Sequence, residues 1–433
     1  MLASIYAARR AELARRMQRG VAIVPTAPER LRNRDAHYPY RYDSYFYYLT
    51  GFTEPEAVLA IVVDEKEAAR SILFCRDRDA EREAWEGSRH GPDEARTAFG
   101  FDEAYSIKRI DEVMPELLSN QPGLYAHLGS DTSNDTRVMA WVNTVRARVR
   151  SGVSAPQSIS DVHALLDEMR LIKDAAEIDT MRRAAAISAG AHRRAMQMAA
   201  PGIGEFAIEA ELLHEFRRHG AQAPAYTSIV ASGAHACVLH YVENSAVMGD
   251  GELLLIDAGC ELNGYASDIT RTFPVNGRYT PAQREVYELV LAAQQAAIDQ
   301  VKPGTRWNAP HDAAVRVLAQ GFLDLGLLTG SLQQVLETEA YKQFYMHRTG
   351  HWLGLDVHDA GDYKRDGEWR ELAAGMVLTV EPGCYIRPAP GVPEGYAGIG
   401  VRIEDDALVT DDGCEILTAD APKTIADIEA LMR

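Results

Sequence analysis

Residues 251–273 read GELLLIDAGCELNGYASDITRTF, and this stretch carries the clearest structural signal in the chain. An apolar run ends at Asp257, an Asn-Gly pair follows at 263–264, and Asp268 precedes a second β-prone run. Asn-Gly between two such runs is a strong short-range signal for a β-hairpin. If this pair forms the loop, Asp257 faces Thr270, and Asp268 projects to the same face one diagonal step away.

The two aspartates favour a bound cation. Asp257 follows the apolar run at 253–256 directly, and an ionised carboxylate at the edge of an apolar strand is costly unless a partner compensates its charge. A lone aspartate in this position is more often a helix cap or half of an ion pair. A second aspartate directed at the same point makes metal binding the better interpretation.

Three more segments carry similar signals. Residues 347–358 read HRTGHWLGLDVH, in which glycines between three histidines permit close approach to a ligand. Glu381 and Glu404 each lie inside or at the end of an apolar run, where glutamates are rarely found without a partner. Taken singly, either glutamate could pair with Arg402. Taken together, the segments predict that these carboxylates and histidines gather at one site.

This donor set indicates the metal chemistry. Four carboxylates and an imidazole suit Mn²⁺ or Co²⁺ better than they suit a thiolate-seeking zinc site. The ligand count fits two ions about 3.5–4 Å apart that share bridging carboxylates. Such a pair can hold a hydroxide nucleophile and then stabilise a tetrahedral intermediate.

The composition excludes several classes of function. Asp and Glu outnumber Lys and Arg by 63 to 45, and the net charge of −18 repels phosphate backbones and anionic lipids. We therefore expect no nucleic-acid and no membrane partner. The five cysteines are scattered without a CxxC spacing, which indicates a reducing compartment. Without a signal-peptide pattern or a long apolar run, we expect a cytoplasmic protein.

The length of 433 residues favours two domains. A helical pattern at 5–19 and apolar runs at 21–24 and 57–63 predict a helix and buried strands in an α/β N-terminal domain over 1–172. The remainder, 173–433, is expected to be an α+β domain with mostly antiparallel strands. Its expected helices are 178–198, 205–219, 281–301 and 308–326, and its other expected extended segments are 226–242, 375–387 and 398–410.

The chain resembles the pita-bread metallopeptidases of family M24 over nearly its whole length. The segments that carry this resemblance are LIDAG at 255–259, SDITRTF at 267–273, HRTGHWLGLDVHD at 347–359, VEPG at 380–383 and RIEDD at 402–406. In the first domain, YPYR at 38–41 and TGFTEPEAV at 50–58 resemble the aminopeptidase P branch. The resemblance implies a pita-bread fold for the second domain.

The resemblance also implies roles for individual residues. The implied metal ligands are Asp257, Asp268, His351, Glu381 and Glu404, with Asp268 and Glu404 bridging two divalent ions. Mn²⁺ is the expected ion, with Co²⁺ or Zn²⁺ as alternatives. The implied catalytic residues are Glu381, His240, His358 and Arg402, and the implied substrate contacts are His240, His347, His358, Tyr385 and Trp85.

In the implied reaction, a hydroxide between the metal ions attacks the scissile carbonyl, and Glu381 helps move its proton to the leaving nitrogen. Tyr385 and Arg402 would support Asp257 through hydrogen bonds. One position departs from the pattern, because many relatives carry glycine where Arg348 stands. We expect this cation to alter peptide preference.

The implied activity is release of an N-terminal residue from peptides whose second residue is proline. The bond before proline has no N–H for an ordinary peptidase to bind, and proline restricts the preceding residue. A prolidase, which cleaves only Xaa-Pro dipeptides, is the nearest alternative, followed by a non-catalytic pita-bread binding module and an α+β domain with purely structural acidic and histidine networks. The resemblance further implies a homo-oligomer, either a dimer or a tetramer.

Overall fold

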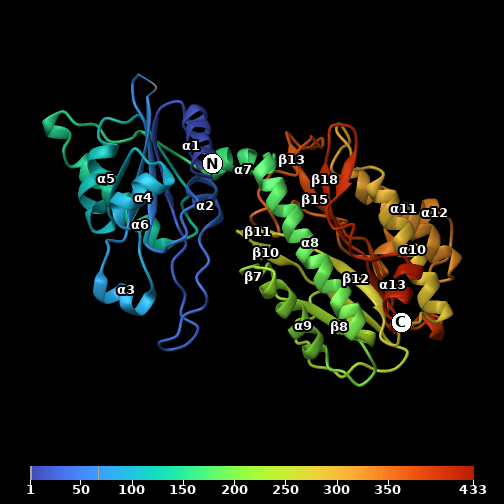
Figure 1. Ribbon diagram of the computed structural model, residues 1–433. Coiled ribbons are helices and arrows are strands. Elements are labelled where there is room, and N and C mark those ends of the chain that lie inside the picture. The colour runs from blue at the N-terminus through green and yellow to red at the C-terminus, as the bar shows by residue number, and fades with distance from the viewer. Residues whose placement is uncertain (1, 67) are drawn as a thin grey trace. The chain divides into compact units, whose positions relative to one another are not determined.

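Helix α7 (His163–Leu171) contains the point at which the chain divides into two units, Met1–Met169 and Arg170–Arg433. The division lies near the boundary expected after residue 172. The computed structural model describes residues 2–66 and 68–433 (Figure 1). In this part of the chain, no helix combines the length and apolar character that crossing a bilayer requires.

The first unit contains a mixed six-stranded sheet in the order β4-β3-β2-β1-β5-β6. Strands β1 and β5 are parallel, as are β5 and β6, whereas β2 is antiparallel to both of its neighbours. Its strands are β1 (Gly20–Pro25), β2 (Val58–Val63), β3 (Ala69–Cys75), β4 (Glu103–Ser106), β5 (Gly123–Ala126) and β6 (Ser158–Ser160). The predicted α/β character and the predicted early strands are confirmed.

Helices accompany this sheet: α1 (Leu2–Met17), α2 (Ser44–Thr50), α3 (Ala80–Glu86), α4 (Gly91–Phe99), α5 (Ile110–Leu118) and α6 (Thr132–Arg146). Side chains of α5 and α6, among them Met114 and Trp141, pack into one core with Ile23 and Phe74 of the sheet. The aromatic-rich segment before Gly51 forms α2. Its Phe46 is buried, as are the core side chains named above.

The second unit is built from short strands and long helices, and every strand pair in its described residues is antiparallel, as predicted. Its strands are β7 (Ala223–Pro224), β8 (Ile229–Ser232), β9 (Leu253–Asp257), β10 (Cys260–Leu262), β11 (Tyr265–Ala266), β12 (Thr270–Pro274), β13 (Lys364–Arg365), β14 (Glu368–Trp369), β15 (Val377–Val380), β16 (Gly383–Tyr385), β17 (Gly400–Arg402), β18 (Asp405–Val409) and β19 (Cys414–Ile416). Its helices are α8 (Ala175–Met198), α9 (Glu205–Arg218), α10 (Pro281–Ile298), α11 (Ala309–Asp324), α12 (Leu332–Glu337) and α13 (Ile425–Leu431).

The hairpin register predicted from the Asn-Gly pair is confirmed. Asn263 and Gly264 have φ values of 51° and 83°, as a turn with two left-handed residues requires, and Asp257 pairs with Thr270. The strands are nevertheless interrupted at Gly259, where a Cβ atom would lie 1.7 Å from the carbonyl oxygen of Ser267. The prediction of one continuous hairpin was therefore wrong, since β10 and β11 join a different sheet with β7.

The prediction of an extended segment at 226–242 is also wrong over most of that range. Only β8 is a strand, and a 3₁₀ helix at Gly233–Cys237 follows it. Gly233 has a left-handed φ of 54°, which turns the chain out of the sheet. The carboxylate of Glu205 accepts hydrogen bonds from the backbone and hydroxyl of Ser232, and these bonds fix the strand end.

Candidate metal centre

A cavity of about 720 Å³ in the second unit brings the predicted polar residues together. Its lining includes all five predicted ligands, Asp257, Asp268, His351, Glu381 and Glu404, together with His240, His347, Arg348, His358 and Arg402. Tyr385 is buried and contacts His347 and Arg402 through its hydroxyl. Trp85 lies in α3 of the first unit and is 86% exposed, and its substrate contact stays a prediction.

The ends of antiparallel strands place the carboxylates. Asp257 is the last residue of β9, and Asp268 lies two residues before β12, the strand that pairs with β9. Glu381 lies between β15 and β16, and Glu404 lies between β17 and β18. Because β15 pairs with β18 and β16 pairs with β17, these two connections meet. The ends of strands from three small antiparallel sheets thus present four carboxylates to one cavity.

Tyr226 joins the two aspartates. Its hydroxyl lies 2.6 Å from Asp257 Oδ1 and still closer to Asp268 Oδ1, so both carboxylates aim at one point, as the hairpin register predicted. A phenol has a single hydrogen and cannot donate to both carboxylates at once. A shared proton or a cation is needed to relieve the remaining repulsion between the oxygens.

A chain of hydrogen bonds centred on Arg402 supports the opposite side of the cavity. Arg402 donates through Nη2 to Asp257 Oδ2 at 2.6 Å, through Nη1 to the Tyr385 hydroxyl at 3.1 Å and through Nε to Thr270 Oγ1 at 3.1 Å. The Thr270 hydroxyl donates in turn to Glu404 Oε2 at 2.6 Å. Each branch fixes the orientation of a carboxylate or of the arginine itself.

His351 is oriented as a metal-binding imidazole is. Its Nδ1 lies 3.0 Å from the carbonyl oxygen of Trp352 and donates to it, so Nε2 is the ring nitrogen that faces the cavity. Nε2 lies 3.5 Å from Asp268 Oδ2 and 3.6 Å from Glu381 Oε1. One donor atom each from Asp268, His351 and Glu404 lie within 4.8 Å of one another.

The electrostatics of the cluster fit a cation. Burial and mutual repulsion raise the pKa of Asp257 and of Glu404, and burial raises the pKa of Glu381 to about 7. Burial disfavours a charged His351, yet its hydrogen bond to Asp268 and the charge of Glu381 raise its pKa to about 9. Burial and repulsion between neighbouring carboxylates thus favour the uncharged forms of Asp257, Glu381 and Glu404. Divalent ions relieve the same repulsion, and oxygen donors with one imidazole suit them.

A buried ion cluster anchors the end of the histidine segment. Asp359 follows His358, and its Oδ1 accepts from Arg170 Nη2 at 2.5 Å while its Oδ2 accepts from Lys173 Nζ at 2.9 Å. The side chains of all three residues are 1% exposed. Burial alone would raise the pKa of Asp359, but Lys173 and Arg170 hold it below its usual value.

Two residues of this site, Tyr226 and Thr270, were not predicted from the sequence to belong to it. The hairpin register places Thr270 directly opposite Asp257, so that register could have identified it. No pattern around Tyr226 indicated a site, because it precedes β8 and reaches the aspartates only through tertiary structure. Arg348 lines the cavity, with its guanidinium carbon 5.5 Å from the centroid of the Trp369 ring, and its effect on peptide preference stays a prediction.

Comparisons with known proteins agree with this site and fold. Residues 179–411 match metallopeptidase family M24, and residues 6–125 match the N-terminal domain of aminopeptidase P. The chain therefore belongs to metallopeptidase family M24 and carries the aminopeptidase P type of N-terminal domain. The pita-bread fold implied by the sequence resemblance is confirmed.

Relatives that share almost the whole chain are named Xaa-Pro aminopeptidase. The protein of that name from Haemophilus influenzae is 49% identical over 404 residues, covering 93% of this chain and 91% of its own. The Escherichia coli protein of the same name is 45% identical over 425 residues, covering 98% and 96%.

Solved structures agree with these relatives. The aminopeptidase PepP of Pseudomonas aeruginosa has a TM-score of 0.98 at 51% identity and covers 100% of this chain and 98% of its own. Zinc-substituted Escherichia coli aminopeptidase P in complex with product has a TM-score of 0.97 at 44% identity, again covering 100% and 98%.

Proposed function

We propose that this chain is a metal-dependent Xaa-Pro aminopeptidase, which releases the N-terminal residue from peptides with proline in second position. The observation that carries the proposal is the meeting of Asp257, Asp268, His351, Glu381 and Glu404 on one cavity. Relatives that share almost the whole chain bear this activity in their names.

The five donors would hold divalent metal, and we propose two ions, with Mn²⁺ as the occupant. Bound ions of this kind supply Lewis acidity, which polarises a substrate carbonyl and activates water. Oxygen-rich donor sets favour Mn²⁺ over softer ions, although affinity order alone does not select the occupant.

Glu381 is suited to hold and move a proton. Its carboxylate faces the cavity beside the other donors, and a positioned carboxylate can take up a proton from a reacting group and pass it on. The carboxylate lies at the surface of the cavity, with Oε1 3.4 Å from the Thr379 hydroxyl. We assign Glu381 to proton transfer toward the leaving nitrogen of the cleaved bond.

His240 and His358 would contact the substrate. Both imidazoles are exposed at the cavity, and the His358 ring packs edge-on against His351 with centroids 4.4 Å apart. The apolar side chains of Leu239, Val242 and Val357 line the same cavity. A proline ring needs such apolar contact and offers no N–H to bind, so this wall fits the proposed specificity.

Arg402 and Tyr385 are assigned to positioning. Arg402 holds Asp257 and Thr270, and the Tyr385 hydroxyl lies between Arg402 and His347 Nε2 at 3.1 and 2.8 Å. Rigid support of this kind keeps the donor oxygens in place while substrate binds and product leaves. We further propose a cytoplasmic homo-oligomer, in line with the sequence.

Cleavage of an Xaa-Pro-Xaa tripeptide and of an Xaa-Pro dipeptide, each with chelator-treated and Mn²⁺-restored enzyme, tests the proposal. Mn²⁺-dependent release of the first residue from the tripeptide is expected. Cleavage of the dipeptide alone would identify a prolidase. Failure on both substrates, by enzyme shown to contain metal, would contradict the proposal and favour a binding module.

A further inference from the structure

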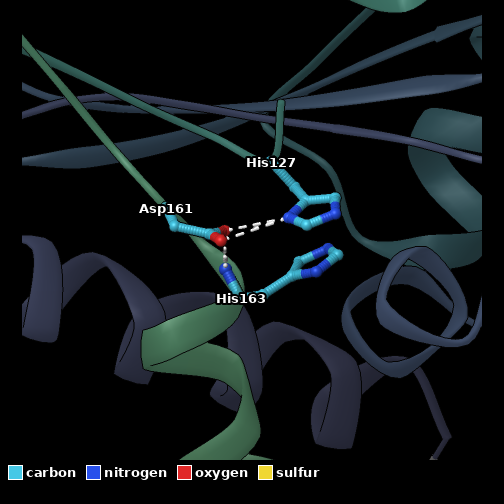
Figure 2. Close-up of side chains that lie close together, drawn as sticks. All are labelled: His127, Asp161 and His163. Atoms are coloured by element: carbon cyan, nitrogen blue, oxygen red, sulfur yellow. Dashed lines mark hydrogen bonds and ion pairs between the residues drawn. The ribbon is translucent and has the colours of Figure 1, made fainter. Parts of the chain in front are cut away.

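A second group of metal-ligand side chains lies in the first unit, away from the catalytic donors in sequence. It consists of His127, Asp161 and His163, and one donor atom of each lies within 4.8 Å of the other two (Figure 2). The described residues contain one further group of this kind, formed by Asp268, His351 and Glu404 of the catalytic cavity. The proposed peptidase reaction leaves the group in the first unit without a role.

The sheet topology brings these residues together. His127 directly follows β5 and Asp161 directly follows β6, and these two strands are parallel neighbours. The carboxyl ends of parallel strands meet at one sheet edge, where α/β domains commonly bind ligands. Asp161 also accepts from the backbone N–H of His163 at 2.9 Å as α7 begins, which brings the second imidazole to the same edge.

The local geometry holds the donors close together. His127 Nδ1 lies 3.2 Å from both carboxylate oxygens of Asp161. The two imidazoles stack on each other, as Figure 2 shows. Their centroids are 3.9 Å apart, with an interplanar angle of 12°. Tyr45 stacks on His163 at 3.7 Å, and its hydroxyl donates to Asp167 at 2.6 Å. The tyrosine therefore limits how far the His163 ring can move.

The group is also accessible. The side chains of His127 and Asp161 are 34% and 52% exposed. His127 and His163 line a cavity of about 500 Å³ that extends over the ends of β1 and β5, with Pro25, Asp131 and Arg137 on its wall. An ion can reach the donors from this cavity, and water in it can complete a coordination shell.

We propose that His127, Asp161 and His163 form a second metal site, which binds one divalent transition-metal ion of the Zn²⁺ type. Two imidazoles and a carboxylate are common zinc ligands, and three protein donors leave one position for water. The nearly parallel rings must tilt toward a shared ion, so binding opens the stack. The bound ion links the ends of β5 and β6 to the start of α7.

The test compares full-length proteins, each equilibrated with Zn²⁺ and freed of unbound metal. Asp161→Asn keeps an oxygen that can accept from the His163 N–H but removes the charge, and His127→Gln removes one imidazole. His219→Gln is the matched control, because it removes a surface histidine that pairs with Glu215 and lies outside both donor groups. Zn²⁺ per chain is measured for all four proteins.

Wild type and His219→Gln are expected to bind about one more Zn²⁺ per chain than Asp161→Asn or His127→Gln. The Co²⁺-loaded wild type should show an absorption component that both site variants lack. Equal melting temperatures in chelator establish that the site variants fold, and tripeptide hydrolysis should persist in them. Equal Zn²⁺ counts with identical Co²⁺ spectra in all four proteins would contradict the proposed metal site. The three side chains would then form only a cluster of stacked rings and a carboxylate.

Discussion

Arg402 and Asp257 form a charge-assisted pair in which Nη2 lies 2.6 Å from Oδ2, between side chains that are 5% and 14% exposed. The same guanidinium reaches Thr270 and Tyr385, so it uses the planar fork that lysine lacks. Asp257 is consequently held from one side by Arg402 and from the other by Tyr226.

Arg402→Lys is expected to lower kcat/KM for an Xaa-Pro-Xaa tripeptide by roughly 10–100-fold, because one ammonium cannot replace three directed bonds. Steady-state kinetics measures the loss. Arg387→Lys is the control, since Arg387 donates to the carbonyl of Cys237 and does not contact a ligand. Equal losses in the two variants would contradict a specific role for Arg402.

Tyr226→Phe is expected to weaken Mn²⁺ binding by roughly 10–100-fold, because the aspartates lose the hydroxyl that joins them. Activity measured against Mn²⁺ concentration gives the half-saturating value. Tyr241→Phe removes a hydroxyl that donates to Glu205, outside the ligand set, and should leave that value unchanged. An unchanged value in Tyr226→Phe would remove this tyrosine from the metal site.

Thr270→Val keeps the side-chain shape and removes the bonds to Glu404 and Arg402. We expect weaker metal binding by about 10-fold or more, since a ligand carboxylate loses its orienting donor. Thr272→Val provides a comparison on the same strand, because its hydroxyl bonds only the backbone of Arg402. That variant should lose stability while its metal affinity stays near wild type, as metal titration and thermal melting together would reveal.

Metal removal is expected to destabilise the second unit, because its buried carboxylates lose their compensating charge. Restoring Mn²⁺ at ~100 times its dissociation constant should add about 3 kcal/mol to the free energy of unfolding for each ion bound. Thermal melting with chelator and with Mn²⁺ measures the difference. Asp268→Asn should show a much smaller Mn²⁺ effect, and a full effect in that variant would place the stabilising ion elsewhere.

His192 predicts a pH dependence of stability. It is fully buried, and its Nε2 donates to the carbonyl of Ala258 at 2.9 Å. Burial lowers its pKa from 6.5 to about 4, so between these values the unfolded chain binds a proton that the folded chain does not. Stability is therefore retained above pH 6.5 and falls as pH decreases toward 4, by up to about 3 kcal/mol.

His192→Gln keeps a donor for Ala258 and removes this titration. Denaturant unfolding of the chelated proteins at a series of pH values should give a flatter acid limb for the variant than for wild type. The variant starts from lower stability at neutral pH because its shape differs, so the slopes are compared rather than the absolute values. Parallel slopes would assign the acid sensitivity to other groups.

The sequence predicted the parts of the site that depend on local rules. An Asn-Gly turn fixes the pairing of neighbouring strands, so the register of Asp257 against Thr270 followed from residue spacing alone. The position of Glu381 and Glu404 at the ends of apolar runs marked both as site residues, because buried carboxylates need a partner. Each of these features depends on residues that lie close together in the chain.

The parts that the sequence did not predict depend on contacts between distant segments. The break at Gly259 follows from the close approach of Ser267 and from pairing of β10 with β7, which lies far upstream in the chain. Tyr226 belongs to the site only because tertiary structure brings it to the aspartates. The segment after β8 has an extended-looking composition, but Gly233 and the bonds to Glu205 turn it into a 3₁₀ helix.

The ion cluster around Asp359 sets a limit on how short a working fragment of this protein can be. The family match begins at residue 179, yet the two cations that neutralise Asp359 are at positions 170 and 173. A gene truncated at the family boundary would encode a chain with a buried, uncompensated carboxylate next to His358, a defect that typically costs about 3–5 kcal/mol. An independently expressed catalytic fragment therefore has to begin upstream of Arg170.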